Sequence, residues 1–132
     1  LHQLKERRTI MGLDQYAYVS KNGKHDDDSR GIAYWRKHNR LQGWMENKYI
    51  DDGGKEQFNC VAVELTVEDM EQLEVVINNR MLPETGGFFF GSDSYSDYED
   101  KEYGYKDDDL KFIDNARDEL NKGNKVFYNC WW

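Results

Sequence analysis

Residues 82–91 (LPETGGFFFG) constrain the fold more than any other stretch, because they hold the only proline, a glycine pair and three consecutive phenylalanines. Pro83 fixes its own φ and disfavours helical backbone at Leu82, so a preceding helix must end there. Side chains alternate between the faces of a strand, so the rings of residues 88–90 cannot share one face. The run predicts a central strand buried on both faces. The alternative is a glycine-bounded ligand loop, although its spacing matches neither a P-loop nor a dinucleotide fingerprint.

The aromatic content indicates a folded chain despite a polar average. The 132 residues fit one domain with a sizeable core. Charged residues make up 33% and the hydrophobic set only 38%. The 14% of aromatic residues supply burial that the modest aliphatic content does not, so we expect a compact fold.

The formal charge of −8 argues against general binding to DNA or to anionic membranes, and it permits partners with a basic surface. No apolar run approaches the roughly 20 residues that span a bilayer, and no signal peptide is visible, so we expect a cytoplasmic protein. Cys60 and Cys130 are too few for a disulfide scaffold or a zinc quartet. We expect both to be buried thiols in a reducing cytoplasm.

Residues 1–10 differ from the rest, with a net charge of +2 and a poor hydrophobic pattern. Glu6, Arg7 and Arg8 can be encoded by a ribosome-binding sequence, and two codons then separate them from Met11. We therefore expect residues 1–10 to be a translated leader or an added extension outside the fold. Residues 11–132 are expected to form a single domain.

The periodicity predicts an α+β fold with about five strands in a mainly antiparallel sheet and three helices packed on one side. Four strands are predicted from β-forming residues, and residues 88–90 supply the fifth. The four are 12–20, 31–35, 58–65 and 125–132. A parallel pair around residues 58–90 would have a right-handed connection.

The three helices are predicted from apolar residues at helical spacing. The first follows Asn39 as its cap, the second follows Thr66, and the third runs from Leu110 to Lys122. Thr66 is a good N-cap residue, and Asp69 three positions later is a shorter relative of the capping-box glutamate. The strand, cap and helix of residues 58–80 therefore form the clearest local unit.

Residues 92–109 contain eight acidic residues and four tyrosines. One interpretation is a solvated loop whose last acids, 107–109, stabilise the start of the next helix. The other is a protein-recognition surface, because tyrosines supply contact area at low entropy cost and carboxylates imitate phosphates. The candidate contact residues are Asp93, Tyr95, Asp97, Tyr98, Glu99, Asp100 and Tyr103.

Residues 34–48 form the one patch in which basic and aromatic residues alternate. Such residues can bind a phosphate or a base, but large rings at helical spacing usually pack into a core. An alternative ligand site is therefore predicted where this patch meets the glycine loop, with an acid or base, a ring and two anion-binding cations. Its residues are Asp14, Tyr34, Arg36, Lys37, Gly86, Gly87 and Gly91.

The run of His25 followed by three aspartates does not have the spacing of a metal site, because consecutive side chains point in different directions. Nor do the acids of residues 92–109 match a calcium loop. We predict no metal and no cofactor.

Four sequence boxes resemble a family of small proteins found in bacteriophages and some bacterial genomes. They are MGLD at 11–14, YWRK at 34–37, LPETGGFFFG at 82–91 and an aromatic end at 128–132. The resemblance covers residues 11–132, and it implies no established activity and no catalytic residues. Some related phage sequences are labelled as phosphoglycerate kinases, but this chain has no phosphate-binding loop and lacks the bulk of a two-lobed kinase. Relatives often have a histidine where Gln42 or Gly43 stands here.

Two functions are consistent with these features. The first is a phage-encoded acidic accessory protein that binds a host or phage protein with a basic surface, as a nucleic-acid mimic or an anti-defence inhibitor. It would act in the host cytoplasm without binding nucleic acid or membrane directly. The alternative is a protein that binds a small ligand or a nucleotide, an enzyme included. No nucleophile, base or metal spacing indicates an enzyme class, so binding is the expectation.

Overall fold

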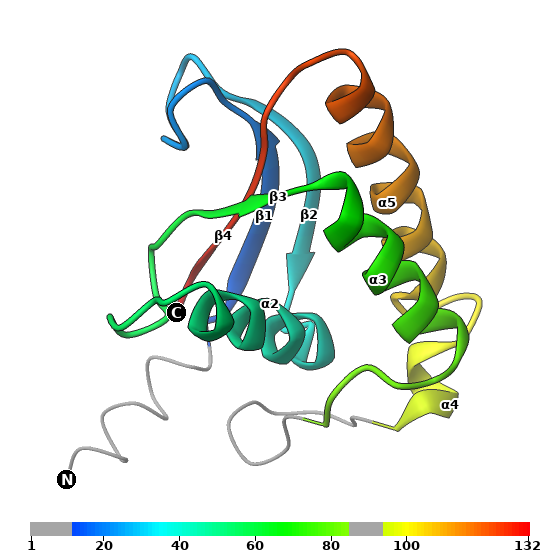
Figure 1. The fold of residues 1–132 in the computed structure, drawn as a ribbon. Helices are drawn as coiled ribbons and strands as arrows, with labels where there is room; N and C mark the ends of the chain where they lie inside the picture. The colour runs from blue at the N-terminus through cyan, green and yellow to red at the C-terminus, as the bar shows by residue number, and fades with distance from the viewer. Residues whose placement is uncertain (1–11, 85–93) are drawn as a thin grey trace, which may run out of the picture.

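A computed structural model describes residues 12–84 and 94–132 of the chain (Figure 1). Four strands form one antiparallel sheet in the order β2-β1-β4-β3. They are β1 (Asp14–Val19), β2 (Arg30–Arg36), β3 (Val63–Leu65) and β4 (Val126–Trp131). The predicted α+β class and the antiparallel sheet are confirmed. The predicted leader and the fifth strand at 88–90, with its parallel pairing, lie outside the described residues.

The described residues form four helices rather than the predicted three, and the three long ones cover one face of the sheet (Figure 1). They are α2 (Asn39–Asp51), α3 (Val67–Asn78) and α5 (Lys106–Asn121). A fourth, α4 (Tyr95–Tyr98), is a single turn within the segment that the sequence describes as a loop. Helix α5 begins four residues before the predicted start, so Asp107, Asp108 and Asp109 all lie in its first turn.

The predicted strand at 58–65 is too long, because only Val63–Leu65 pairs with β4. Residues 58–62 form a loop that is bound to the end of β4 by irregular contacts. The side chain of Asn59 bonds both the N–H and the carbonyl oxygen of Trp132. Cys60 has a φ of 60°, and its N–H donates to the carbonyl oxygen of Cys130 at 2.8 Å. Because these backbone N–H and carbonyl groups are bonded irregularly, they do not form the regular hydrogen-bond ladder of a strand.

The N-terminal caps of α3 and α2 fix where these two helices begin. The predicted capping box of α3 is confirmed, because Asp69 N–H donates to Thr66 Oγ1 at 3.2 Å and Thr66 N–H donates to the Asp69 carboxylate at 2.8 Å. Helix α2 is capped by His38 rather than by Asn39. The N–H of Leu41 donates to Nδ1 of His38, whose backbone is bonded to the buried Gln15 side chain.

The core lies between the sheet and the helices. Trp35 of β2 packs edge-on against Phe112 of α5, with ring centroids 5.0 Å apart, and also contacts Tyr128 of β4. Helix α3 contributes its apolar stripe of Met70, Leu73 and Ile77. The predicted burial of the aromatic residues is confirmed for Trp35, Phe112 and Tyr128, whereas Tyr34 and Trp131 are exposed, which corrects it for those two.

The two cysteines have different environments. Cys130 is buried on β4, as predicted, and burial raises the pKa of its thiol to about 11. Cys60 is exposed, which corrects the prediction of two buried thiols, because the loop at 58–62 turns its side chain outward.

Within residues 12–84 and 94–132 no helix is long and apolar enough to cross a membrane. The same residues bring together no group of three or more His, Cys, Asp or Glu side chains that could hold a metal ion.

Candidate functional site

The acidic, tyrosine-rich segment folds back on the domain through two of its tyrosines. The Tyr98 ring is buried, and its hydroxyl donates to the Asp109 carboxylate at 2.7 Å. Tyr95 lies half-buried beneath the guanidinium group of Arg40, 4.6 Å from the ring centroid, and its hydroxyl accepts the N–H of Leu82. These two predicted contact residues therefore anchor the segment to the rest of the domain.

The α4–α5 turn, residues 99–105, has a defined backbone. The Asp100 carboxylate accepts the N–H groups of Glu102 and Tyr103 at 2.9 and 2.7 Å, and these bonds lower its pKa. A Cβ at Gly104 would lie 2.3 Å from the Tyr98 carbonyl oxygen, so no side chain fits there. The turn holds the side chain of Tyr103 81% exposed at its tip.

The acidic side chains near Tyr103 differ in whether they are ion-paired within the protein or exposed to solvent. Glu99 forms ion pairs with Arg80 at 3.2 Å and with Lys106 at 3.3 Å. Asp100 is exposed, but its carboxylate holds the turn. Asp97 before the turn, Glu102 within it, and Asp107 and Asp108 after it are also exposed, and Asp107 is ion-paired with the exposed Lys101. Asp93 lies outside the described residues.

The turn is fastened to the domain by the buried carboxylate of Asp109. Its Oδ1 accepts the indole N–H of Trp35 at 2.9 Å, and its Oδ2 lies 2.7 Å from Nε2 of His38 and from the Tyr98 hydroxyl. Because Nδ1 of His38 accepts from Leu41, Nε2 carries the proton and donates to Asp109. Burial, together with the charge of Asp109, raises the pKa of Tyr98.

This His-Asp-Tyr cluster resembles catalytic chemistry only in composition. All three side chains are buried, and His38 and Tyr98 both hydrogen-bond to the Asp109 carboxylate. The Tyr105 ring stacks on the His38 ring, with the two centroids 4.3 Å apart, and covers that side of the cluster. Since a reactive group must meet its substrate, we interpret the cluster as structural.

Three members of the alternative ligand site, Asp14, Tyr34 and Arg36, lie on paired strands β1 and β2, on the sheet face opposite the helices. The hydroxyl of Tyr34 donates to the Asp14 carboxylate at 2.6 Å, which raises the pKa of Tyr34. Arg36 stands directly opposite Asp14 in the strand register. Tyr34 is 57% exposed, so its ring is available at the surface.

Of the other predicted members, only Lys37 lies within the described residues. Lys37 leaves the strand with a φ of 57°, and its N–H is bonded to the carbonyl oxygen of Leu13. Gly86, Gly87 and Gly91 lie outside the described residues. The sequence therefore predicts a grouping of which the structure shows Asp14, Tyr34 and Arg36.

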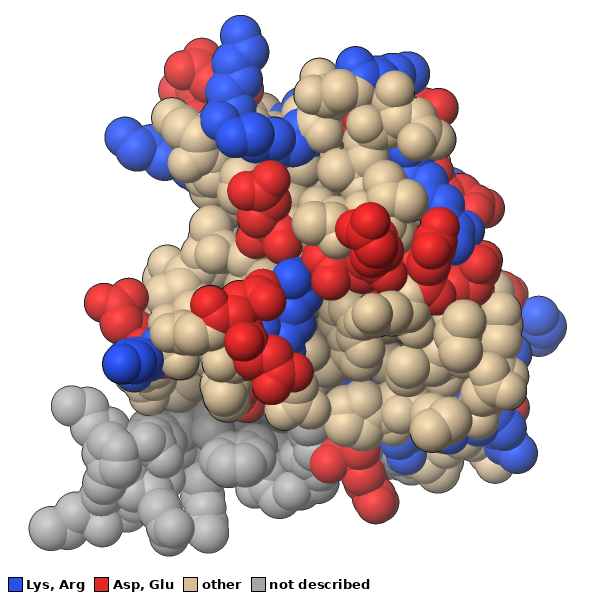
Figure 2. Space-filling view, viewed as in Figure 1, with Lys and Arg blue, Asp and Glu red and all other residues tan. Residues whose placement is uncertain are grey.

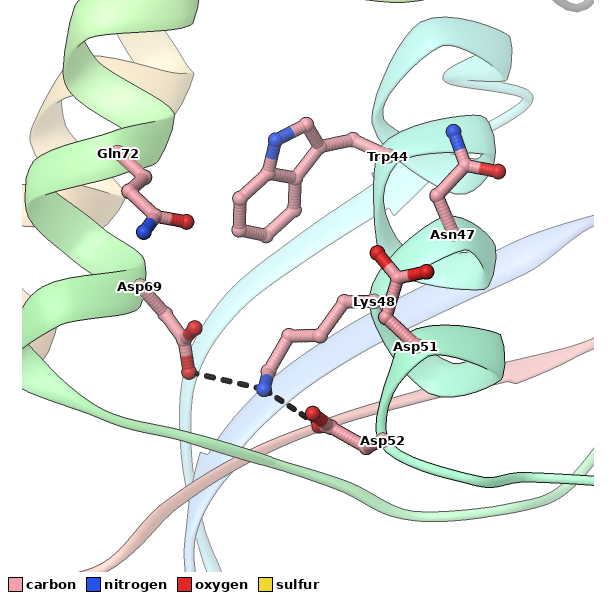
Figure 3. A pocket seen from close by; sticks show the side chains of 7 residues that line it. All are labelled: Trp44, Asn47, Lys48, Asp51, Asp52, Asp69 and Gln72. Atoms are coloured by element: carbon pink, nitrogen blue, oxygen red, sulfur yellow. Dashed lines mark hydrogen bonds and ion pairs between the residues drawn. The ribbon is translucent and has the colours of Figure 1, made fainter.

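A cleft between α2 and α3 is a feature that the sequence does not indicate (Figure 3). Its volume is about 290 Å³. The lining side chains are an indole, two amides, one ammonium group and three carboxylates, from Trp44, Asn47, Gln72, Lys48, Asp51, Asp52 and Asp69. Figure 2 shows acidic side chains gathered around this part of the surface.

Lys48 joins the two walls of the cleft. Its Nζ lies 2.7 Å from an Asp52 oxygen and 3.0 Å from an Asp69 oxygen. Burial opposes the charged form, but the hydrogen bonds to both carboxylates raise the pKa of Lys48. The same oxygen of Asp69 accepts the Thr66 N–H, so the cap of α3 also holds this ion pair.

Comparison with known proteins adds no functional assignment: no family model, no curated protein and no solved structure matches the chain.

Proposed function

We propose that this chain is a small acidic accessory protein that binds another protein, from a host or a phage, through that partner's basic surface. The observation that carries the proposal is the exposed ring of Tyr103 on a turn fixed by Asp100 and Gly104. A tyrosine held in one backbone conformation offers contact area with little loss of entropy on binding.

The charge around this ring favours a basic partner. Asp97, Glu102, Asp107 and Asp108 are exposed near the turn, and the chain as a whole carries −8. Such a surface attracts a basic groove by long-range electrostatics. A nucleic-acid mimic that blocks a defence or transcription protein in the host cytoplasm would use this chemistry. The proposal does not include catalysis.

The proposal is tested by quantitative capture of proteins from host lysate on the immobilised chain. Tyr103→Ala should weaken capture of a specific partner about tenfold or more, the effect of an interface aromatic worth at least about 1.4 kcal/mol. A double variant, Asp97→Lys with Glu102→Lys, should weaken it further and reduce its dependence on salt. Asp100 is left unchanged because its carboxylate holds the turn.

The matched control carries the same charge change elsewhere, with Asp27→Lys and Asp114→Lys at exposed positions. It should retain capture if the α4–α5 turn is the contact. Equal loss in both double variants would show that only net charge matters. Unchanged capture by Tyr103→Ala would refute the turn as the binding surface.

The second candidate function is a site for a small ligand or a nucleotide on the outer face of the sheet. The contact between Tyr34 and Asp14, with Arg36 opposite, favours it, because an exposed ring beside a cation can stack on a base and bind a phosphate. Chemical-shift changes at these three residues on addition of a nucleoside monophosphate would support it, and their absence would count against it.

A further inference from the structure

The cleft between α2 and α3 has the size of a pocket for one side chain. Sites for drug-sized ligands span about 300–1,000 Å³, and the cleft lies just below that range at about 290 Å³. Its walls are side chains of two helices that are packed on the same sheet, so the pocket exists without a ligand (Figure 3).

The charge of the cleft favours a cation. Three carboxylates, from Asp51, Asp52 and Asp69, face one ammonium group, from Lys48, which leaves a net charge of −2. Lys48 is already held between Asp52 and Asp69, so it offers little attraction to an anion. Asp51 is exposed at the cleft and adds a further carboxylate for an incoming positive group.

The shape and lining favour a flat cation. Figure 3 shows the Trp44 ring reaching from α2 toward α3, above the Lys48 ion pairs. A guanidinium group stacks on an indole face and donates in its own plane to carboxylate and amide oxygens. Gln72 reaches toward the cleft from α3 with such an amide group, and Asn47 lines the α2 side. An ammonium group has no plane to stack, so the same lining suits it less well.

We propose that the α2–α3 cleft binds the guanidinium group of an arginine side chain on a protein partner. The inference rests on the proposed function for the source of that arginine, and it adds a second contact at a distinct surface. The guanidinium group would stack on Trp44 and pair with Asp51, while Lys48 keeps its two carboxylates.

The test is a titration of the full chain, followed by ¹H–¹⁵N NMR, with the blocked tripeptide Gly-Arg-Gly. Its matched control contains citrulline, which has the same shape without the charge. The arginine peptide should shift the Trp44 indole N–H and the side-chain amides of Asn47 and Gln72. The citrulline peptide should bind at least about tenfold more weakly, and a lysine peptide should bind with intermediate affinity.

Two variants separate the cleft from the general acidity of the surface. Asp51→Asn should weaken arginine binding several-fold, and Asp114→Asn, an exposed acid on α5, should leave it unchanged. Trp44→Leu should also weaken binding, and the remaining resonances show whether each variant is folded. Equal shifts with citrulline, or equal effects of the two aspartate variants, would overturn the inference.

The result is independent of the capture experiment. If the arginine peptide binds in the cleft but the turn variants capture normally, the cleft remains a guanidinium site and the turn fails as the contact. If the turn variants lose their partner and the peptide leaves the cleft resonances unchanged, only the cleft inference fails.

Discussion

At the residue scale, three consecutive aspartates have different roles. Asp107 and Asp108 are exposed in the first turn of α5, where their negative charges interact favourably with the positive end of the helix dipole. Asp109 is completely buried and accepts hydrogen bonds from Trp35, His38 and Tyr98. Because α5 begins at Lys106, its position three residues before Phe112 and four before Ile113 places it on the buried face of the helix.

Replacement of Asp109 by alanine should lower the free energy of unfolding by about 3–5 kcal/mol, because His38, Trp35 and Tyr98 would lose a buried partner. Asp109→Asn should lose less, since it keeps one acceptor oxygen. Urea denaturation measures the change. Asp108→Ala is the matched control and should stay within about 0.5 kcal/mol of the wild type. Similar losses at both positions would show that the buried bonds contribute little.

At the element scale, a helix starts at the predicted residue where its capping residues are adjacent in the sequence. The box formed by Thr66 and Asp69 starts α3 at the predicted residue. By contrast, α4 is a single turn that depends on the Ser94 side chain and on the contacts of its two tyrosines with the rest of the domain. A short helix of this kind has too few internal hydrogen bonds to be recognised from propensity.

Thr66→Ala should lower the free energy of unfolding by about 1 kcal/mol, because the N–H of Asp69 loses its acceptor at the start of α3. Thermal or urea unfolding measures the effect. Val75→Ala, at an exposed position of the same helix, is the control for introducing an alanine without removing a cap. It should change the free energy of unfolding by less than about 0.5 kcal/mol. A Thr66→Ala variant as stable as this control would mean that the box does not stabilise α3.

At the scale of the whole molecule, one ion pair connects the start of β2 to the end of α5. The Arg30 guanidinium binds both oxygens of Glu119, at 2.9 and 2.7 Å, across 89 positions of sequence. Asn124 adds a third bond to the same carboxylate. The bonds from Arg30 and Asn124 lower the pKa of Glu119 to about 2, from an ordinary value of 4.5.

This pair should make stability depend on pH in a defined window. A carboxylate whose pKa is lower in the folded state stabilises the fold above its ordinary pKa of 4.5, and this contribution disappears as the pH falls toward 2. Arg30→Gln should therefore be less stable than the wild type at pH 7, and the difference should shrink below pH 4.5. Urea unfolding across this range measures it.

The control for the pH prediction is Lys101→Gln, which removes an ion pair whose two side chains are both exposed. Exposed pairs of this kind contribute little, so this variant should follow the wild type at every pH. A difference between Arg30→Gln and the wild type that stays constant from pH 7 to pH 2 would contradict the role of Glu119.

The exposure and the neighbours of the candidate site residues depend on contacts between separate elements, so they could not be predicted from the sequence. Tyr98 and Tyr103 lie in one acidic, tyrosine-rich segment, yet Tyr98 is buried and Tyr103 is 81% exposed. Which ring turns inward depends on Asp109 and Gly104, and neither contact has a local sequence signature. The cleft depends on Lys48 meeting Asp69, two residues on separate helices. The outer-face contact of Tyr34 with Asp14 likewise needs the register of two strands.

The amino-acid sequence alone determined the class of fold, the three main helices, the strands β1, β2 and β4, and the acidic balance of the surface. These features arise from hydrophobic periodicity, capping residues and charge, which act over a few neighbouring positions. Only the tertiary structure decided that Asp109 is buried, that Tyr103 is exposed and that α2 and α3 enclose a cleft. Those outcomes depend on packing between segments far apart in the chain, where the solvation of each polar group is set by its spatial neighbours.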